Sequence, residues 1–139
     1  MQVLAGGIAN STVVNSGGGI NLAGGTANNV AVNSGGSVNV SSGGTVAGMT
    51  NGGSINVLEG GLVSGGNVSG GTLYLRSNGS AADVSLENYG SVYVSSGAVL
   101  NDVAINSHGF AGVSSGIISK VTVNSKGYFT VNSGASVTD

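Results

Sequence analysis

The chain alternates short apolar runs with pairs of glycines. Within residues 20–37, the runs Ile20-Asn21-Leu22 and Val30-Ala31-Val32 each place apolar residues on both sides of a small or polar one. This period of two predicts half-buried β-strands. Each run is followed by a glycine pair, Gly24-Gly25 or Gly35-Gly36, and glycine reaches the backbone angles that tight corners require. The unit therefore predicts strand, corner, strand and corner.

This unit recurs along the whole chain at spacings of 17 to 19 residues. Copies begin near Gln2, Ile20, Val38, Ile55, Leu73, Val92, Ala111 and Phe129. Such a unit cannot bury its apolar face alone, so successive copies must stack on one another. No segment long enough for a helix lies between the strands. We therefore predict an all-β chain, a right-handed parallel β-helix (β-solenoid) of about 18–19 residues per coil, with residues 1–139 forming a single β-helix fragment of about seven and a half coils.

Stacking converts the repeat into columns of side chains that run along the solenoid. The valines Val94 and Val103 are expected inside, and the residues between the inward positions are expected to face outward. The outward column comprises Asn21, Asn39, Asn56, Tyr74, Tyr93, Gly112 and Thr130, and a corner column comprises Asn15, Asn33, Asn51, Asn106 and Asn124. Stacked amides hydrogen-bond along such columns, which predicts a structural role for them. Glycan binding by Asn21, Asn39 and Asn56 is the alternative.

Composition narrows the class of protein further. The chain has 28 glycines but no proline and no Gly-X-Y triplet repeat, which argues against collagen. Only 6% of residues are charged, so no basic patch favours a nucleic-acid partner. Cysteine is absent, and no apolar run is long enough to predict membrane insertion of this segment. Met1 leads straight into repeat sequence without a signal peptide, so we expect a piece of a longer repeat array.

The repeats resemble those of AIDA-type autotransporter adhesins, the self-associating autotransporter family. The motifs are Val14-Asn15-Ser16-Gly17-Gly18, Val32-Asn33-Ser34-Gly35-Gly36 and Val40-Ser41-Ser42-Gly43-Gly44-Thr45, and the resemblance covers essentially the whole chain. It implies a right-handed parallel β-helix passenger that is secreted through its own outer-membrane barrel and displayed on a Gram-negative cell. It further implies adhesion to host-surface receptors or glycans, auto-aggregation and biofilm formation, and serine modification by an O-heptosyltransferase. The chain departs from a full member in lacking both a signal peptide and a barrel.

Few residues could carry catalysis. Asp83, Asp102 and Lys120 each precede the first valine of a strand and should share one column. Two neighbouring carboxylates suit acid/base chemistry, so a carbohydrate-active enzyme, a polysaccharide lyase or hydrolase using Asp83 and Asp102, is the alternative function. The other interpretation, which we favour, is an exposed ladder in which Lys120 offsets Asp102. Arg76 and His108 lack partners at the repeat spacing and are expected to be solvated corner residues.

No cofactor or metal site is predicted. The calcium-binding repeat needs aspartate in a Gly-Gly-x-Gly-x-Asp setting, which does not occur, and no His/Cys cluster offers zinc ligands. An ice-binding solenoid would need a flat threonine array, and the outward column is mixed. We therefore predict a non-enzymatic adhesive module at the cell surface that associates with itself. The candidate self-association face is Asn21, Asn39, Asn56, Tyr74, Tyr93 and Thr130.

Overall fold

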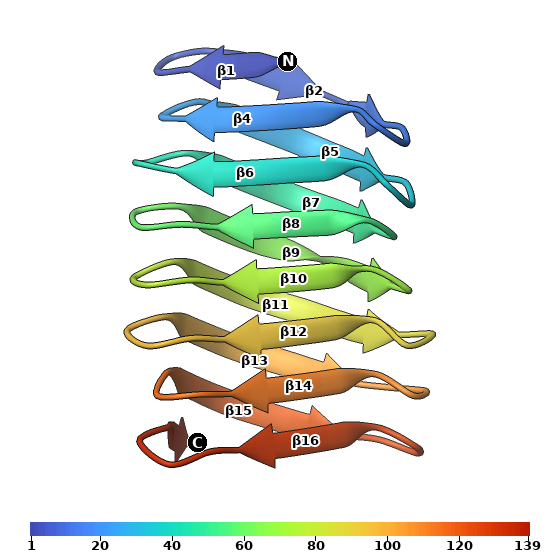
Figure 1. Cartoon of the computed structure of the whole chain (residues 1–139), viewed down its shortest axis with the longest axis vertical. Coiled ribbons are helices and arrows are strands. Elements are labelled where there is room, and N and C mark those ends of the chain that lie inside the picture. Colours follow the sequence, from blue (N-terminus) through green and yellow to red (C-terminus); the bar gives the residue numbers. More distant parts are fainter.

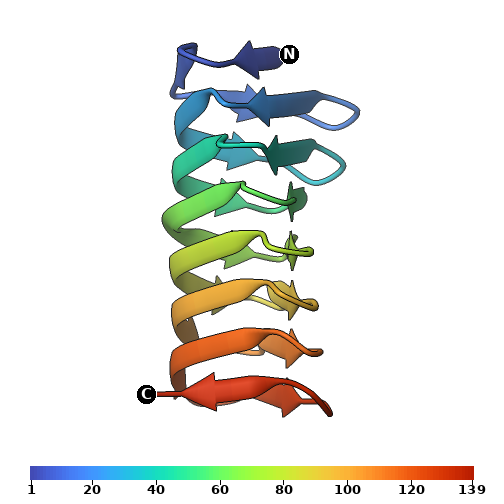
Figure 2. The same ribbon diagram turned by 90° about the vertical axis from the view of Figure 1, so that its left-hand side faces the viewer.

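The computed structural model describes all residues 1–139 as a right-handed β-solenoid built from two parallel sheets. In Figure 1 the chain descends from the N-terminus, running right to left across the sheet nearer the viewer and left to right across the sheet behind it. We call these the front sheet and the back sheet. Figure 2 shows the rungs lying directly above one another. The predicted fold class is confirmed, and the right-handed winding is the usual hand of parallel crossovers.

The front sheet has eight strands, one for each rung. In spatial order they are β1 (Gln2–Leu4), β4 (Gly19–Ala23), β6 (Ser37–Ser41), β8 (Ser54–Val57), β10 (Thr72–Leu75), β12 (Ser91–Val94), β14 (Phe110–Val113) and β16 (Tyr128–Val131). The back sheet contains β2 (Ile8–Asn10), β5 (Thr26–Val32), β7 (Thr45–Asn51), β9 (Leu62–Ser69), β11 (Ser80–Glu87), β13 (Val99–Ile105), β15 (Ile117–Val123) and β17 (Ser136–Thr138), and the short β3 (Val13–Val14) also pairs with β5.

The core is a single cluster of 29 buried apolar residues, contributed by the inward positions of both sheets. Val94 and Val103 are buried as predicted, at 1% and 0% exposure. The front-sheet register pairs Ile20, Val38, Ile55, Leu73, Val92, Ala111 and Phe129 in one continuous inward column. The first coil differs from the prediction, because Gln2 pairs with Asn21 and not with Ile20. Val3 is consequently the buried residue of β1, and Leu4 is exposed.

Each full-length back-sheet strand bends where one residue adopts a positive φ. This bend column consists of Ser11, Asn29, Gly48, Gly65, Asp83, Asp102 and Lys120, with φ between 50° and 75°. Side-chain alternation breaks there: Ala27 is buried, the next two residues face outward, and Val30 is buried again. The bend turns the second half of the strand toward the following corner, and asparagine, aspartate and glycine are the residues that most readily adopt this conformation.

Tight corners depend on glycine where one rung contacts the rung before it. A methyl group added at Gly90 would overlap the Val68 carbonyl oxygen of the previous rung. Exposed corners also carry amide ladders, in which Asn33 Nδ2 donates to Asn15 Oδ1 at 2.8 Å and Asn124 Nδ2 donates to Asn106 Oδ1 at 2.6 Å. These two contacts follow the predicted asparagine column.

Asn51 does not belong to that column, which corrects the prediction. The register pairs Asn51 with Val32 and Val68, so its side chain points into the core and is fully buried. The corner that follows it contains only Gly52 and Gly53, whereas the corner before it contains residues 33–36 and the corner after it contains residues 69–71. Asn51 Oδ1 accepts a hydrogen bond from the Gly53 N–H at 3.0 Å, and its Nδ2 donates to the Thr72 carbonyl at 2.9 Å. The amide side chain thus supplies the polar contacts that the shortened corner needs.

Candidate functional site

The predicted association residues all lie in one outward row of the front sheet. The strand register pairs, in succession, Asn21, Asn39, Asn56, Tyr74, Tyr93, Gly112 and Thr130. We call this set the front row. All of its members except Gly112 are exposed or half-exposed. Period-two alternation places them outward because their neighbours on both sides are the buried core positions.

The N-terminal half of the front row is an amide ladder. Asn39 Nδ2 donates to Asn21 Oδ1 at 2.9 Å, and Asn56 Nδ2 donates to Asn39 Oδ1 at 3.1 Å. Each amide has two N–H groups and an oxygen with two lone pairs, and the ladder uses only one donor and one acceptor of its middle member. The remaining groups are directed to the surface, where they can bind a partner.

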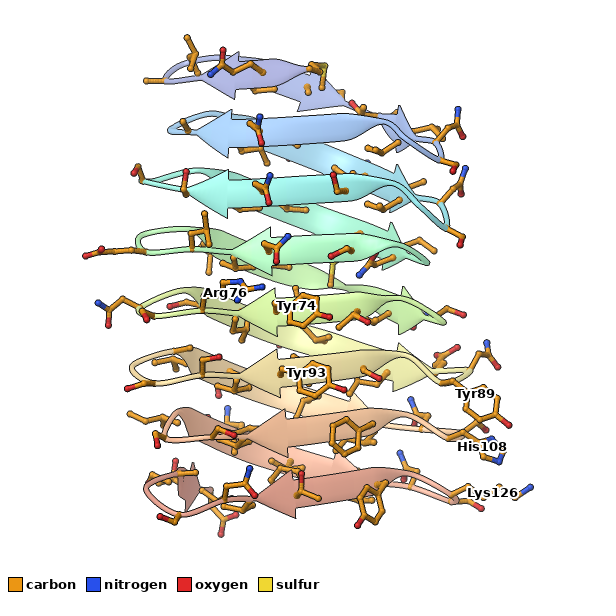
Figure 3. All side chains as sticks on the ribbon, in the orientation of Figure 1. Tyr74, Arg76, Tyr89, Tyr93, His108 and Lys126 are labelled. Atoms are coloured by element: carbon orange, nitrogen blue, oxygen red, sulfur yellow. The ribbon has the colours of Figure 1, made fainter.

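Arg76 joins the two halves of the front row. Its Nε and Nη2 donate to Asn56 Oδ1 at 3.4 and 3.3 Å, and its guanidinium carbon lies 5.2 Å from the centre of the Tyr74 ring. Figure 3 shows Arg76 beside Tyr74 on the same face. Arg76 is an exposed corner residue, as expected, but it also has side-chain partners. The guanidinium group lies within cation–π range of the ring. Comparing residues one repeat apart does not predict this contact, because Arg76 lies only two residues after Tyr74 in the same rung.

The C-terminal half of this surface is a ladder of aromatic rings. It begins in the front row and continues in the neighbouring column, which contains Phe110 and Tyr128. Tyr74 and Tyr93 stack at a centroid distance of 5.6 Å, Tyr93 and Phe110 meet at 5.5 Å, and Phe110 and Tyr128 stack at 5.8 Å. The column changes at Gly112, because the Phe110 ring lies over that glycine, where a methyl group would sit 3.0 Å from Phe110 Cε1. Phe110 and Tyr128 were not among the predicted site residues, although their 18-residue spacing indicates that they stack.

The geometry of this surface suits binding by contact. The sheet presents amide and aromatic groups on successive rungs, and no cavity opens beside them. The structure's one cavity, of about 290 Å³, lies on the back sheet around Asn29, Gly48, Met49 and Gly66. No group of three or more His, Cys, Asp or Glu side chains comes together.

The structure also contains no helix that is long and apolar enough to cross a membrane.

The carboxylates Asp83 and Asp102 occupy exposed positions of the bend column. Their φ values are 56° and 60°, and Lys120 follows in the same column at 50°. All three side chains are exposed, and neither carboxylate lines the cavity. A positive φ is a position that aspartate and asparagine tolerate well, which gives both residues a conformational reason to be there. The structure thus brings the predicted pair into one column without enclosing a reaction site.

Replacing both Asp83 and Asp102 with asparagine should therefore change little. Asparagine adopts the same backbone conformation, as Asn29 does in this column with φ 53°. We expect the free energy of unfolding to change by less than about 0.5 kcal/mol per site, measured by urea denaturation. Cleavage of a polysaccharide by the parent chain, lost in the double variant, would show instead that the pair is catalytic.

Comparisons with known proteins find six matching chains among solved structures and no sequence relative. No protein-family model matches the chain, and no curated protein matches it. Among solved structures, the crystal structure of the TibC-catalyzed hyper-glycosylated TibA55-350 fragment is similar, with 23% sequence identity and a TM-score of 0.45. The match covers 99% of this chain and 86% of that one. A likeness of this size assigns neither a family nor a function to the chain.

Proposed function

We propose that this chain is a structural and adhesive repeat module that associates with other copies of itself through the front row. The observation that carries the proposal is the unbroken succession of outward amide and aromatic groups from Asn21 to Tyr128. Because the side chains are already ordered by stacking on one another, they lose little rotamer freedom when a partner binds. The resemblance of the repeats to AIDA-type passengers supports a place on the outer surface of a Gram-negative cell.

Repetition gives the surface its strength. Each rung offers one weak contact, but two solenoids laid side by side make many such contacts at once, and the summed affinity greatly exceeds that of any single contact. The net charge of −2 and the 6% content of charged residues leave little repulsion between like surfaces. Adhesion, auto-aggregation and biofilm formation are the cellular consequences that we propose for this association.

Three lysines on the front row should abolish the association. In the triple variant Asn39→Lys, Asn56→Lys and Tyr74→Lys, each copy gains three positive charges that face the same charges on its partner. We expect the dissociation constant to rise by about tenfold or more, which corresponds to at least ~1.4 kcal/mol. Sedimentation velocity over a range of protein concentrations measures this, and high salt should partly restore association by screening the charges.

A matched control places the same charges on the same three rungs of the back sheet. Ala47, Ser64 and Ala82 form an outward row there, are paired in register and are not buried. Three lysines at these positions repel one another within the chain as much as three lysines on the front row do. Any loss of folding stability caused by this repulsion should therefore be the same in the control and in the front-row variant. Equal association by the front-row variant, the control and the parent would show that the front row is not the adhesive surface.

Serine modification is the second part of the proposal. Corner serines such as Ser16 and Ser34 are exposed beside the ends of strands, where a glycosyltransferase can reach them. We propose that an O-heptosyltransferase is a partner of the chain. Intact mass after expression with and without such an enzyme tests this, and an unchanged mass would refute it.

A further inference from the structure

Three successive corners carry large side chains where earlier corners use glycine. In the corners that lead from the back sheet to the front sheet, the residues directly before the last glycine include Gly17, Gly35 and Gly70, which have φ between 75° and 80°. The next three corners place Tyr89, His108 and Lys126 at this position, with φ of 66°, 60° and 63°. We call these three residues the corner ladder.

This substitution costs stability. Glycine adopts the left-handed region without strain, asparagine, aspartate and histidine adopt it more often than other residues, and a bulky residue such as tyrosine is an outlier there. The corners themselves are ordinary tight turns: the Gly90 N–H donates to the Glu87 carbonyl at 2.7 Å, and the Gly109 N–H donates to the Asn106 carbonyl at 2.6 Å. Glycine would satisfy the same turns with less strain. Residues held in such conformations gather at functional sites, and Tyr89 is the bulkiest of the non-glycine residues with positive φ in this chain.

The side chains of the corner ladder form one exposed surface. The rings of Tyr89 and His108 stack at a centroid distance of 4.8 Å and an angle of 20°, and Tyr89 is 71% exposed. The His108 N–H donates to the Lys126 carbonyl at 3.1 Å, which places Lys126 on the next rung. Figure 3 shows the three side chains along one edge of the solenoid, at a distance from Tyr74 and Tyr93 of the front row. His108 therefore has a ring partner, which corrects its expected role as an isolated solvated residue.

Charge is distributed unevenly along this edge. Glu87 lies two residues before Tyr89, is half-buried, and its Oε1 accepts a hydrogen bond from Ser85 Oγ at 3.4 Å. In the two following rungs the equivalent position holds the neutral Asn106 and Asn124. The Tyr89 end thus combines an exposed ring with a carboxylate acceptor, whereas the Lys126 end offers an ammonium group with no carboxylate in its own corner.

We propose that the corner ladder binds an acidic oligosaccharide. The apolar face of a sugar ring packs on Tyr89, the sugar hydroxyls donate to Glu87, and a carboxylate of the neighbouring sugar pairs with Lys126 beside His108. An aromatic ring with a polar partner at one end suits a ligand that is apolar on one face and hydroxylated at its rim. The site is separate from the front row, so it stands or fails independently of the proposed self-association.

The test uses the intact chain and two probes of equal length. Isothermal titration with a trimer of galacturonic acid should show binding, and a trimer of neutral galactose should bind about tenfold more weakly or not at all. Tyr89→Gly and Lys126→Gly should each weaken binding of the acidic trimer by about tenfold, because each removes one of the two main contacts. Both variants should remain folded, since glycine is what the earlier corners carry at this position.

Lys120→Gly is the matched control. Lys120 is also an exposed lysine at a positive φ of 50°, but it belongs to the bend column on another edge. Its replacement removes the same charge and should leave the affinity within about twofold. Equal weakening by Lys120→Gly and Lys126→Gly would overturn the proposal, because it would show attraction to overall charge alone. Equal affinity for the two trimers, or no binding of either, would overturn it as well.

Discussion

Val94→Asp is expected to prevent folding, whereas Tyr93→Ser should leave the fold intact. The two residues are neighbours on β12, yet Val94 is 1% exposed and Tyr93 is 42% exposed. The core here is only the gap between two sheets, and Leu75 and Val113 cover Val94 on the adjacent rungs. An unpaired carboxylate in this position costs several kcal/mol, which is a large part of the roughly 5–15 kcal/mol that keeps a domain folded.

Far-UV circular dichroism and urea denaturation of both variants measure this difference. Tyr93→Ser loses the ring contacts with Tyr74 and Phe110, and because both contacts are partly exposed we expect a cost of about 0.5–1.5 kcal/mol. Because the strand period is two, a register shifted by one residue would exchange the two faces. A mild effect of Val94→Asp together with unfolding by Tyr93→Ser would therefore show that the register is displaced.

Asn51→Val should destabilise the chain by about 2–4 kcal/mol, because two partly buried polar groups lose their partners at once. Valine has a suitable shape for the column, since Val32 and Val68 occupy it on the adjacent rungs. The replacement nevertheless leaves the Gly53 N–H and the Thr72 carbonyl without the hydrogen bonds that Asn51 makes. Urea denaturation measures the loss, with the denaturant slope checked for two-state behaviour.

Asn39→Val is the control for this prediction. Asn39 also makes two side-chain hydrogen bonds, to Asn21 and from Asn56, but it is half-exposed and water can replace both. Its replacement should cost less than about 1 kcal/mol. If the two variants lose equal stability, the shortened corner does not depend on the buried amide, and our account of Asn51 is wrong.

The sequence was sufficient to predict the structural features that follow the repeat, but not the features that depart from it. Period and alternation were enough to identify the inward columns, because burial of Val94 and Val103 follows from counting. Asn51 was misplaced because a 17-residue coil can lose its residue on either side of the asparagine, and Asn51-Gly52-Gly53 resembles an ordinary corner. Only the register of the neighbouring rungs shows that the corner after Asn51 has lost two residues relative to the preceding corner, and that one of them is offset by an additional residue between Val40 and Thr45.

The aromatic and corner ladders were missed for a different reason. Counting at a fixed period finds residues in the same column, whereas Phe110 reaches Tyr93 diagonally because Gly112 leaves space for its ring. The stack of Tyr89 on His108 involves positions that are glycine in the earlier corners. Because these positions are glycine in the earlier repeats, the repeat pattern identifies them only as corners and does not indicate that their side chains contact one another.

The amide ladders also give the solenoid a direction. In each of them the side-chain N–H groups donate toward the N-terminal end: Asn39 to Asn21, Asn33 to Asn15 and Asn124 to Asn106. Aligned amide dipoles add along the axis and polarise one another, so the stack carries a partial positive charge toward its N-terminal end and a partial negative charge toward its C-terminal end. A ladder can therefore be extended by further rungs only head to tail, because an inverted rung would bring donor against donor or acceptor against acceptor.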